Sequence, residues 1–333
     1  MWSWRFVFVV FVFILGSRAP AWSQAGAWKD LSPHRARLVP VDDHVRLEVL
    51  DWGGSGRALV LLAGGGNTAH VFDDFAPMLT GHNHVYGITR RGFGASEYAE
   101  TVDPGEQFGR DILAVVDGLK LDRPVLVGHS LGGAELSWMA NAHPDRIAGV
   151  VYLDAGYSYA FDNGKGTPVR EMMGRKAPDP PSPGTADLAS FTALQRYWER
   201  VDGFKLPEAE LRAQRETNGD GSVGGYRNLP GGQVLQKLID GGPKFTKVPV
   251  PALFIFANPH GLGPWVDANE SARRAARSFS EGMTRLTAKQ VKAVEEGLPE
   301  ARVIVIRNAH HFVFLSNETE VLRDMAEFFR AVR

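Results

Sequence analysis

Short apolar runs alternate along the chain with segments in which apolar residues recur at helical spacing. In residues 107–119, for example, Phe108, Ile112, Val115 and Leu119 repeat every three or four positions, which predicts a helix. Similar patterns predict helices at 131–142 and 318–332, and apolar runs predict strands at 46–52, 58–63, 84–89, 124–128, 147–154, 250–257 and 302–307. Such alternation is typical of a mostly parallel, doubly wound sheet covered on both faces, so we expect an α/β fold.

The alternation is interrupted between about residues 156 and 247. This segment is rich in proline, glycine and charge, and only 188–201 and 207–216 within it have a helical pattern. Insertions of this length are usually functional. We therefore expect a partly helical cap, with a surface subdomain of no catalytic role as the alternative. Its aromatic residues could line an apolar substrate pocket or form the core of the cap: Tyr157, Tyr159, Phe161, Phe191, Tyr197 and Trp198.

Residues 1–25 have the pattern of a secretory signal peptide. Arg5 precedes an unbroken apolar run from Phe6 to Leu15, and small residues follow as far as Ala25. The run is too short to cross a bilayer core of about 30 Å as a helix. We expect export to the periplasm or the medium, with residues 26–333 as the mature domain and no membrane attachment after cleavage. An uncleaved membrane anchor is the alternative.

Charge and cysteine content exclude several classes of function. The chain carries 37 basic and 38 acidic residues, a net charge of −1, which becomes −3 when cleavage removes Arg5 and Arg18. This balance gives no electrostatic basis for binding nucleic acid or an anionic membrane surface. There are no cysteines, so disulfides, thiol nucleophiles and thiolate metal sites are excluded.

The most informative motif is Gly128-His-Ser-Leu-Gly132, which matches G-x-S-x-G. A predicted strand enters it and a predicted helix leaves it, which is the context of a nucleophilic serine on a tight turn. We predict Ser130 as the nucleophile. The turn also places the Leu131 amide at a helix N-terminus, where it can donate to an oxyanion. An ordinary helix-capping serine is the alternative.

A second oxyanion donor is expected in the loop after the 58–63 strand. That loop reads Gly64-Gly65-Gly66-Asn67, and glycines allow the backbone to approach a substrate closely. We predict the Gly65 amide, with the Gly66 amide as the alternative. A phosphate-binding loop is disfavoured because no Gly-Lys-Ser/Thr follows.

The serine needs a base, and the base needs an acid to orient it. Two histidines, His310 and His311, follow the last predicted strand, and we predict His311 as the base with His310 as the alternative. The loop after the 250–257 strand has no carboxylate before Asp267. Asp154 ends the strand that follows the serine helix, and we predict it as the acid, with Asp267 as the alternative.

Together these residues resemble the α/β-hydrolase superfamily from about Val45 to Arg333, apart from the insertion. The segment Arg90-Arg-Gly-Phe-Gly-Ala-Ser96 is similar to the superfamily's Asp-x-Arg-Gly-x-Gly-x-Ser turn, with Thr89 in place of the aspartate. The position of Asp154 resembles that of the acid in haloalkane dehalogenases. Those enzymes and the related epoxide hydrolases use an aspartate nucleophile, so Ser130 argues against both chemistries.

The resemblance implies a serine hydrolase that cleaves a carboxylic ester through an acyl-enzyme, without metal or organic cofactor. The expected partner is a small ester-like molecule, and the oligomeric state is open. One alternative uses the same residues for C–C cleavage, lactone opening or perhydrolysis. The other is a catalytically inactive hydrolase fold that binds a ligand. The superfamily supports many reactions, so the fold alone does not select among these.

Overall fold

The computed structural model describes residues 28–100, 103–174, 177–232 and 242–332. The predicted signal peptide, residues 1–25, lies outside the described residues. Within those residues, no helix combines the length and the apolar character needed to cross a bilayer.

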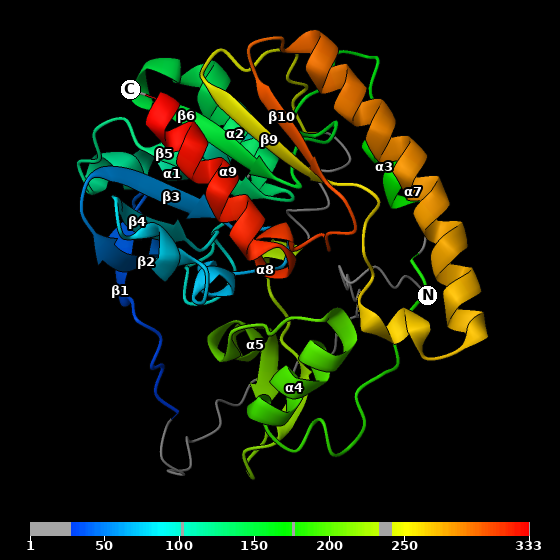
Figure 1. The fold of residues 1–333 in the computed structure, drawn as a ribbon. Coiled ribbons are helices and arrows are strands. Elements are labelled where there is room, and N and C mark those ends of the chain that lie inside the picture. Colours follow the sequence, from blue (N-terminus) through cyan, green and yellow to red (C-terminus); the bar gives the residue numbers. More distant parts are fainter. Residues whose placement is uncertain (1–27, 101–102, 175–176, 233–241, 333) are drawn as a thin grey trace.

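The centre of the fold is an eight-stranded sheet in the order β1-β2-β4-β3-β5-β6-β9-β10 (Figure 1). Antiparallel pairing joins β1 to β2 and β2 to β4, and every other pair is parallel. The predicted mostly parallel α/β sheet is therefore confirmed, and strand β1 is an addition that the apolar pattern missed. The strands are β1 (Arg35–Pro40), β2 (Arg46–Gly54), β3 (Arg57–Leu62), β4 (Asn83–Ile88), β5 (Val125–His129), β6 (Gly149–Leu153), β9 (Ala252–Ala257) and β10 (Arg302–Ile306).

Alternate residues of each central strand pack into separate cores on the two faces of the sheet. In β3, Leu59 and Leu61 face a core that contains α9 (Glu318–Ala331), whereas Val60 and Leu62 face α1 (Pro104–Gly118) and α2 (Gly132–Ala142). Because both faces are covered, the central strands read as continuous apolar runs rather than as alternating ones.

A helix of 28 residues, α7 (Glu270–Gly297), lies where the sequence analysis assigned no element. The Asn269 side chain caps its first turn by accepting from the Ala272 amide at 2.9 Å. Met283, Leu286 and Val294 bury one face against the α1–α2 side of the sheet. Most of the other positions hold charged, polar or small residues, so the apolar stripe is narrow and its period is hard to recognise in the sequence.

The insertion between β6 and β9 has two parts. Residues 156–174, including α3 (Val169–Met173), pack along α7, where Gln290 donates to the carbonyls of Gly156 and Phe161. Beyond the carboxyl ends of the central strands lie α4 (Phe191–Asp202), α5 (Glu208–Gln214) and the antiparallel pair β7 (Arg215–Thr217) and β8 (Val223–Tyr226) (Figure 1). The predicted cap boundaries of about 156 and 247 stay a prediction.

Candidate active site

Ser130 lies in the short turn between β5 and α2. Its backbone has φ +50°, a conformation that L-residues rarely adopt, and its amide donates to the Leu153 carbonyl at 3.2 Å. A Cβ on Gly128 would lie 2.9 Å from the backbone of Gly132, and a Cβ on Gly132 would lie 2.8 Å from the Leu62 carbonyl. The two glycines are therefore what permits the strained serine turn.

The Gly64–Asn67 turn lies directly against Ser130. The Asn67 amide donates to the Gly64 carbonyl at 3.3 Å, and Gly66 has φ +81°. A Cβ on Gly64 would lie 3.1 Å from Ser130 Cβ. Within the described residues, the backbone N–H groups of Gly65 and Leu131 donate to no backbone carbonyl. Both predicted oxyanion donors thus belong to segments beside Ser130.

The side chain of Arg90 holds the Gly64–Asn67 turn in place by hydrogen bonds to backbone carbonyls. It is buried, and it donates to the carbonyls of Ala63 and Gly64, the latter at 2.9 Å. Its Nε and Nη2 also bond to the Glu135 carboxylate on α2, with Nη2 at 2.9 Å from Oε2. Burial raises the pKa of Glu135, and the Arg90 charge opposes this effect. One guanidinium thereby joins the glycine turn to α2, the helix that follows Ser130.

Asp154 and His311 are in contact although they are far apart in the sequence. Asp154 is fully buried after β6, at φ +46°, and His311 follows β10. His311 Nδ1 lies 2.6 Å from Asp154 Oδ2. His129 Nε2 lies 3.0 Å from the His311 carbonyl, and the two rings are 4.7 Å apart. Burial lowers the pKa of His129, so it is neutral and donates from Nε2. The His311 loop is thus held beside Ser130.

His260 is a further residue of the site that no sequence motif marks. It lies in the loop after β9, which has no carboxylate before Asp267, and its Nε2 is 2.6 Å from Asp154 Oδ2. The second oxygen of Asp154 accepts from the Tyr157 hydroxyl at 2.7 Å and from the Ala257 amide at 3.0 Å. Asp154 therefore receives hydrogen bonds from four groups, His311 included.

These contacts set the charge of the Asp154 carboxylate. Burial alone would raise its pKa, but His260 and the hydrogen bonds from His260 and His311 hold it well below the ordinary value. Burial likewise would lower the pKa of His260, and the Asp154 charge and hydrogen bond raise it instead. Asp154 is therefore a carboxylate at neutral pH, which is the state needed to orient an imidazole.

The two alternative residues lie elsewhere. Asp267 ends the 3₁₀ helix η4 (Pro264–Asp267), its side chain is 78% exposed, and it lies 3.7 Å from Arg273. His310 is buried, its Nδ1 accepts from the Phe312 amide at 3.2 Å, and its ring packs on Phe204 of the cap. The geometry thus favours Asp154 and His311 over Asp267 and His310, and their catalytic roles stay predictions.

Most of the aromatic residues singled out in the insertion are buried in the cores. Phe161, Phe191 and Tyr197 belong to the cores on the two faces. Tyr159 is different because it packs against the small cluster that contains Leu131, the residue after Ser130. Burial raises the pKa of Tyr159, and the nearby Ser130 side chain offsets part of the rise. Tyr159 is therefore close to the Ser130 turn.

Comparisons with known proteins agree with this fold. The alpha/beta hydrolase family model matches residues 59–324. The pyrethroid hydrolase of Sphingobium wenxiniae is 36% identical over 103 residues, 29% of this chain and 35% of that protein. The fluoroacetate dehalogenase of a Burkholderia species is 32% identical over 130 residues, 38% of this chain and 42% of that protein. The chain thus spans less than half the length of these curated relatives.

A solved structure gives a longer match. The structure of E-2-(acetamidomethylene)succinate hydrolase has a TM-score of 0.63 at 17% identity and covers 89% of this chain and 99% of that one. At this identity, the likeness shows the fold alone. The relatives act on different bonds, so the reaction has to be argued from the site.

Proposed function

The chain belongs to the alpha/beta hydrolase family, and we propose that it is a serine hydrolase that cleaves carboxylic esters through an acyl-enzyme. The observation that carries this proposal is the contact of His311 Nδ1 with the buried Asp154, in a loop held against the strained Ser130 turn. A serine, a histidine and a carboxylate in this arrangement form an activated nucleophile.

In the proposed reaction, Ser130 Oγ attacks the ester carbonyl and His311 Nε2 takes its proton. The amides of Leu131 and Gly65 stabilise the oxyanion, each by about 3 kcal/mol in the transition state. The intermediate expels the alcohol, which receives the proton from the imidazolium. A water molecule then attacks the acyl-enzyme with His311 again as base, and the acid product leaves as Ser130 recovers its proton.

His260 and Tyr157 act as positioning residues in this scheme. Both donate to the Asp154 carboxylate, so its orientation does not depend on His311 alone. Because Asp154 is fixed, the His311 ring is held in the tautomer with the proton on Nδ1 and the lone pair on Nε2. Tyr159 packs against the cluster that contains Leu131, one of the proposed oxyanion donors.

Ser130 also separates this chain from relatives such as the fluoroacetate dehalogenase. Displacement of a halide by a serine would give an alkyl ether, which water could not release. Transfer of an acyl group to Ser130 gives an ester, which water can release. Lactone opening, C–C cleavage and perhydrolysis can proceed through the same residues, and ester cleavage is the simplest of these acyl transfers. We further propose that the protein is exported, from the pattern of residues 1–25.

The test is hydrolysis of p-nitrophenyl acetate, butyrate and octanoate by the mature chain and by Ser130→Ala. We expect turnover that disappears in the variant, and covalent labelling of the wild type by a fluorophosphonate. Ser137→Ala is the matched control, because Ser137 is buried on α2, the helix that follows Ser130, but hydrogen-bonds to Tyr152 and to the Ala160 carbonyl. A folded wild-type protein that neither turns over any ester nor reacts with the label would overturn the proposal in favour of a binding role.

A further inference from the structure

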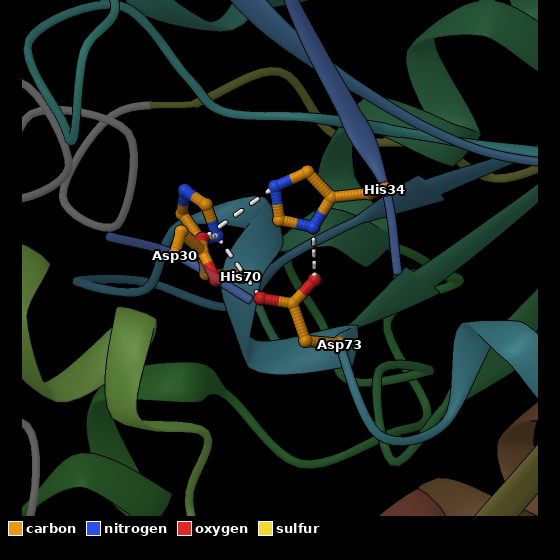
Figure 2. Close-up of side chains that lie close together, drawn as sticks. All are labelled: Asp30, His34, His70 and Asp73. Carbon is orange, nitrogen blue, oxygen red and sulfur yellow. Dashed lines mark hydrogen bonds and ion pairs between the residues drawn. The ribbon is translucent and has the colours of Figure 1, made fainter. Parts of the chain in front are cut away.

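Two histidines and two aspartates gather on the α9 side of the sheet, apart from the catalytic residues. Asp30 and His34 come from the segment that precedes and enters β1, and His70 and Asp73 come from the 3₁₀ helix η1 (Ala69–Phe72) and the residue after it. Figure 2 shows the four side chains close together. The side chains of Asp73, His34 and His70 are 2%, 5% and 12% exposed and that of Asp30 is 25% exposed, so the cluster is mostly buried and reaches solvent at Asp30.

The donor atoms have the spacing of a metal site. Asp30 Oδ2 lies 3.6 Å from His34 Nε2 and 3.5 Å from His70 Nδ1, and His70 Nδ1 lies 3.0 Å from Asp73 Oδ2. One ligand atom from each of the four residues falls within 4.8 Å of all the others. Four N and O ligands at about 2.05 Å from a tetrahedral zinc ion are roughly 3.4 Å apart, so small side-chain adjustments would complete the site.

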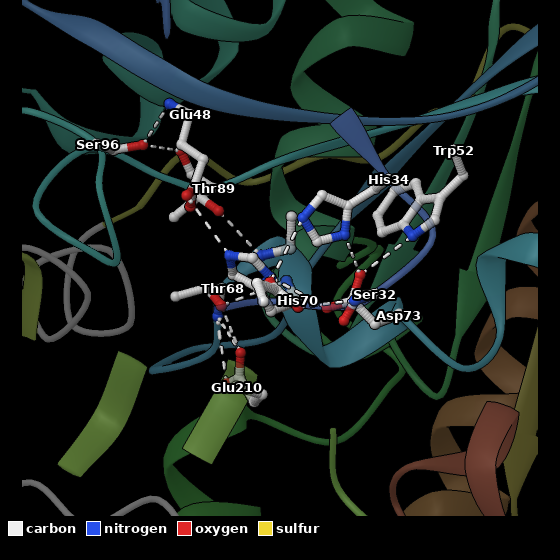
Figure 3. A network of polar contacts seen from close by, with 12 residues as sticks. Ser32, His34, Glu48, Trp52, Thr68, His70, Asp73, Thr89, Ser96 and Glu210 are labelled. Carbon is white, nitrogen blue, oxygen red and sulfur yellow. Dashed lines mark hydrogen bonds and ion pairs between the residues drawn. The ribbon is translucent and has the colours of Figure 1, made fainter. Parts of the chain in front are cut away.

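The outer nitrogen of each imidazole faces a carboxylate. His34 Nδ1 lies 2.7 Å from Asp73 Oδ1, and His70 Nε2 lies 3.5 Å from Glu48 Oε1 (Figure 3). Carboxylates in this position hold the proton on the outer nitrogen and direct the other nitrogen toward the metal. The arrangement presents His34 Nε2 and His70 Nδ1 to Asp30 Oδ2. Asp73 has two contacts: its Oδ1 meets the outer nitrogen of His34, and its Oδ2 lies beside His70 Nδ1.

The charge of the cluster also favours a cation. Asp30, Asp73 and Glu48 contribute three carboxylates around two imidazoles. Among the described residues, no lysine or arginine forms an ion pair with any of the three. The same carboxylates raise the pKa of His70 to about 10, so its imidazolium balances part of their charge without metal. A zinc ion at the centre of the four ligands would displace the proton between His70 Nδ1 and Asp73 Oδ2 and would add to the compensating charge.

We propose that Asp30, His34, His70 and Asp73 bind a zinc ion in a tetrahedral site with two nitrogen and two oxygen ligands. All four positions are filled by protein atoms, which is the form of a structural rather than a catalytic zinc site. The ion would fasten the segment before β1 onto η1. The residue before η1, Thr68, bonds through its amide and hydroxyl to Glu210 of the cap, at 3.1 and 2.5 Å. The metal would thus brace the region between the Gly64–Asn67 turn and the cap.

The experiment measures zinc bound to untagged mature protein by elemental mass spectrometry, followed by thermal unfolding with and without zinc after removal of metal by a chelator. We expect about one zinc per chain, and a rise in Tm of about 5 °C at free zinc near 100 times Kd. Cobalt in place of zinc should give the visible absorption of a tetrahedral site.

The variants are Asp30→Asn, His70→Gln and, as a matched control, His84→Gln. Asp30 is the most exposed ligand, so Asp30→Asn should fold, and it should lose both the bound zinc and the zinc-dependent rise in Tm. His84 pairs with one carboxylate, Asp51 at 2.8 Å, and its variant should keep both. Equal zinc content in wild type and Asp30→Asn would indicate adventitious binding and overturn the proposal. A wild-type Tm that does not change when zinc is added would overturn it as well. None of these readouts depends on turnover at Ser130.

Discussion

Arg90 and Arg91 are neighbours in the sequence but have different partners. Comparing them tests what holds the Gly64–Asn67 turn, called the oxyanion turn below because it carries the proposed Gly65 donor. Arg91 donates to both oxygens of Asp111 on α1, at 2.6 Å each. Arg90 makes the equivalent pair with Glu135 but also holds the carbonyls of Ala63 and Gly64. Both arginines are at least 90% buried. We therefore compare Arg90→Met with Arg91→Met, since methionine fills a similar elongated space without charge.

Each variant breaks one buried ion pair and leaves a carboxylate in the interior. This loss costs about 3–5 kcal/mol. At about 2 °C per kcal/mol for a chain of this size, Tm should fall by about 6–10 °C in both variants. Arg90→Met also takes the arginine donor from two carbonyls: Ala63 is left without one, at about 1–3 kcal/mol if it stays buried, and Gly64 keeps only the Asn67 amide. The turn is therefore expected to shift until those carbonyls find other partners.

Such a shift moves the Gly65 amide away from the oxyanion. A displacement of about 1 Å at a catalytic group can lower the rate about a hundredfold. We therefore expect kcat on p-nitrophenyl butyrate to fall by up to about a hundredfold in Arg90→Met and to stay near wild type in Arg91→Met, measured below the melting range of both. Equal losses of kcat in the two variants, or a loss of stability alone in Arg90→Met, would refute the assignment of Arg90 to the oxyanion turn.

Two further predictions concern the acid. Asp154→Asn should lower kcat by about 10⁴-fold, because an amide holds the wrong tautomer of His311, while circular dichroism shows that the fold is kept. Asp267 is exposed, and Asp267→Asn should keep full activity. The reverse result would move the acid to Asp267. The raised pKa of His260 means that its pairing with Asp154 stabilises the fold fully below about pH 6.5 and is lost as the pH rises through the folded-state pKa. The difference in Tm between wild type and His260→Gln should therefore be larger at about pH 6 than at about pH 9, and a difference that does not change with pH would contradict this charge state.

The amino-acid pattern alone determines much of this protein. Fully buried parallel strands read as apolar runs, and the strand–turn–helix around Ser130 requires small residues at 128 and 132 within one short segment. Local signals of this kind are enough to predict the α/β fold and the strained turn at Ser130. Helix α7 was not predicted, because its apolar stripe is narrow and charged residues lie between the apolar ones in the sequence.

The rest of the site depends on which distant segments the sheet brings together. Asp154 and His311 are joined across 157 positions, and His260 reaches the same carboxylate from a third loop. The Arg90–Glu135 ion pair and the Asp30–His34–His70–Asp73 cluster also join residues from separate segments of the chain. Periodicity and turn chemistry reflect only neighbours along the chain. The contact of His311 with Asp154 rather than Asp267, and the partner of each buried charge, therefore come from tertiary packing, where a desolvated charge persists only beside a partner.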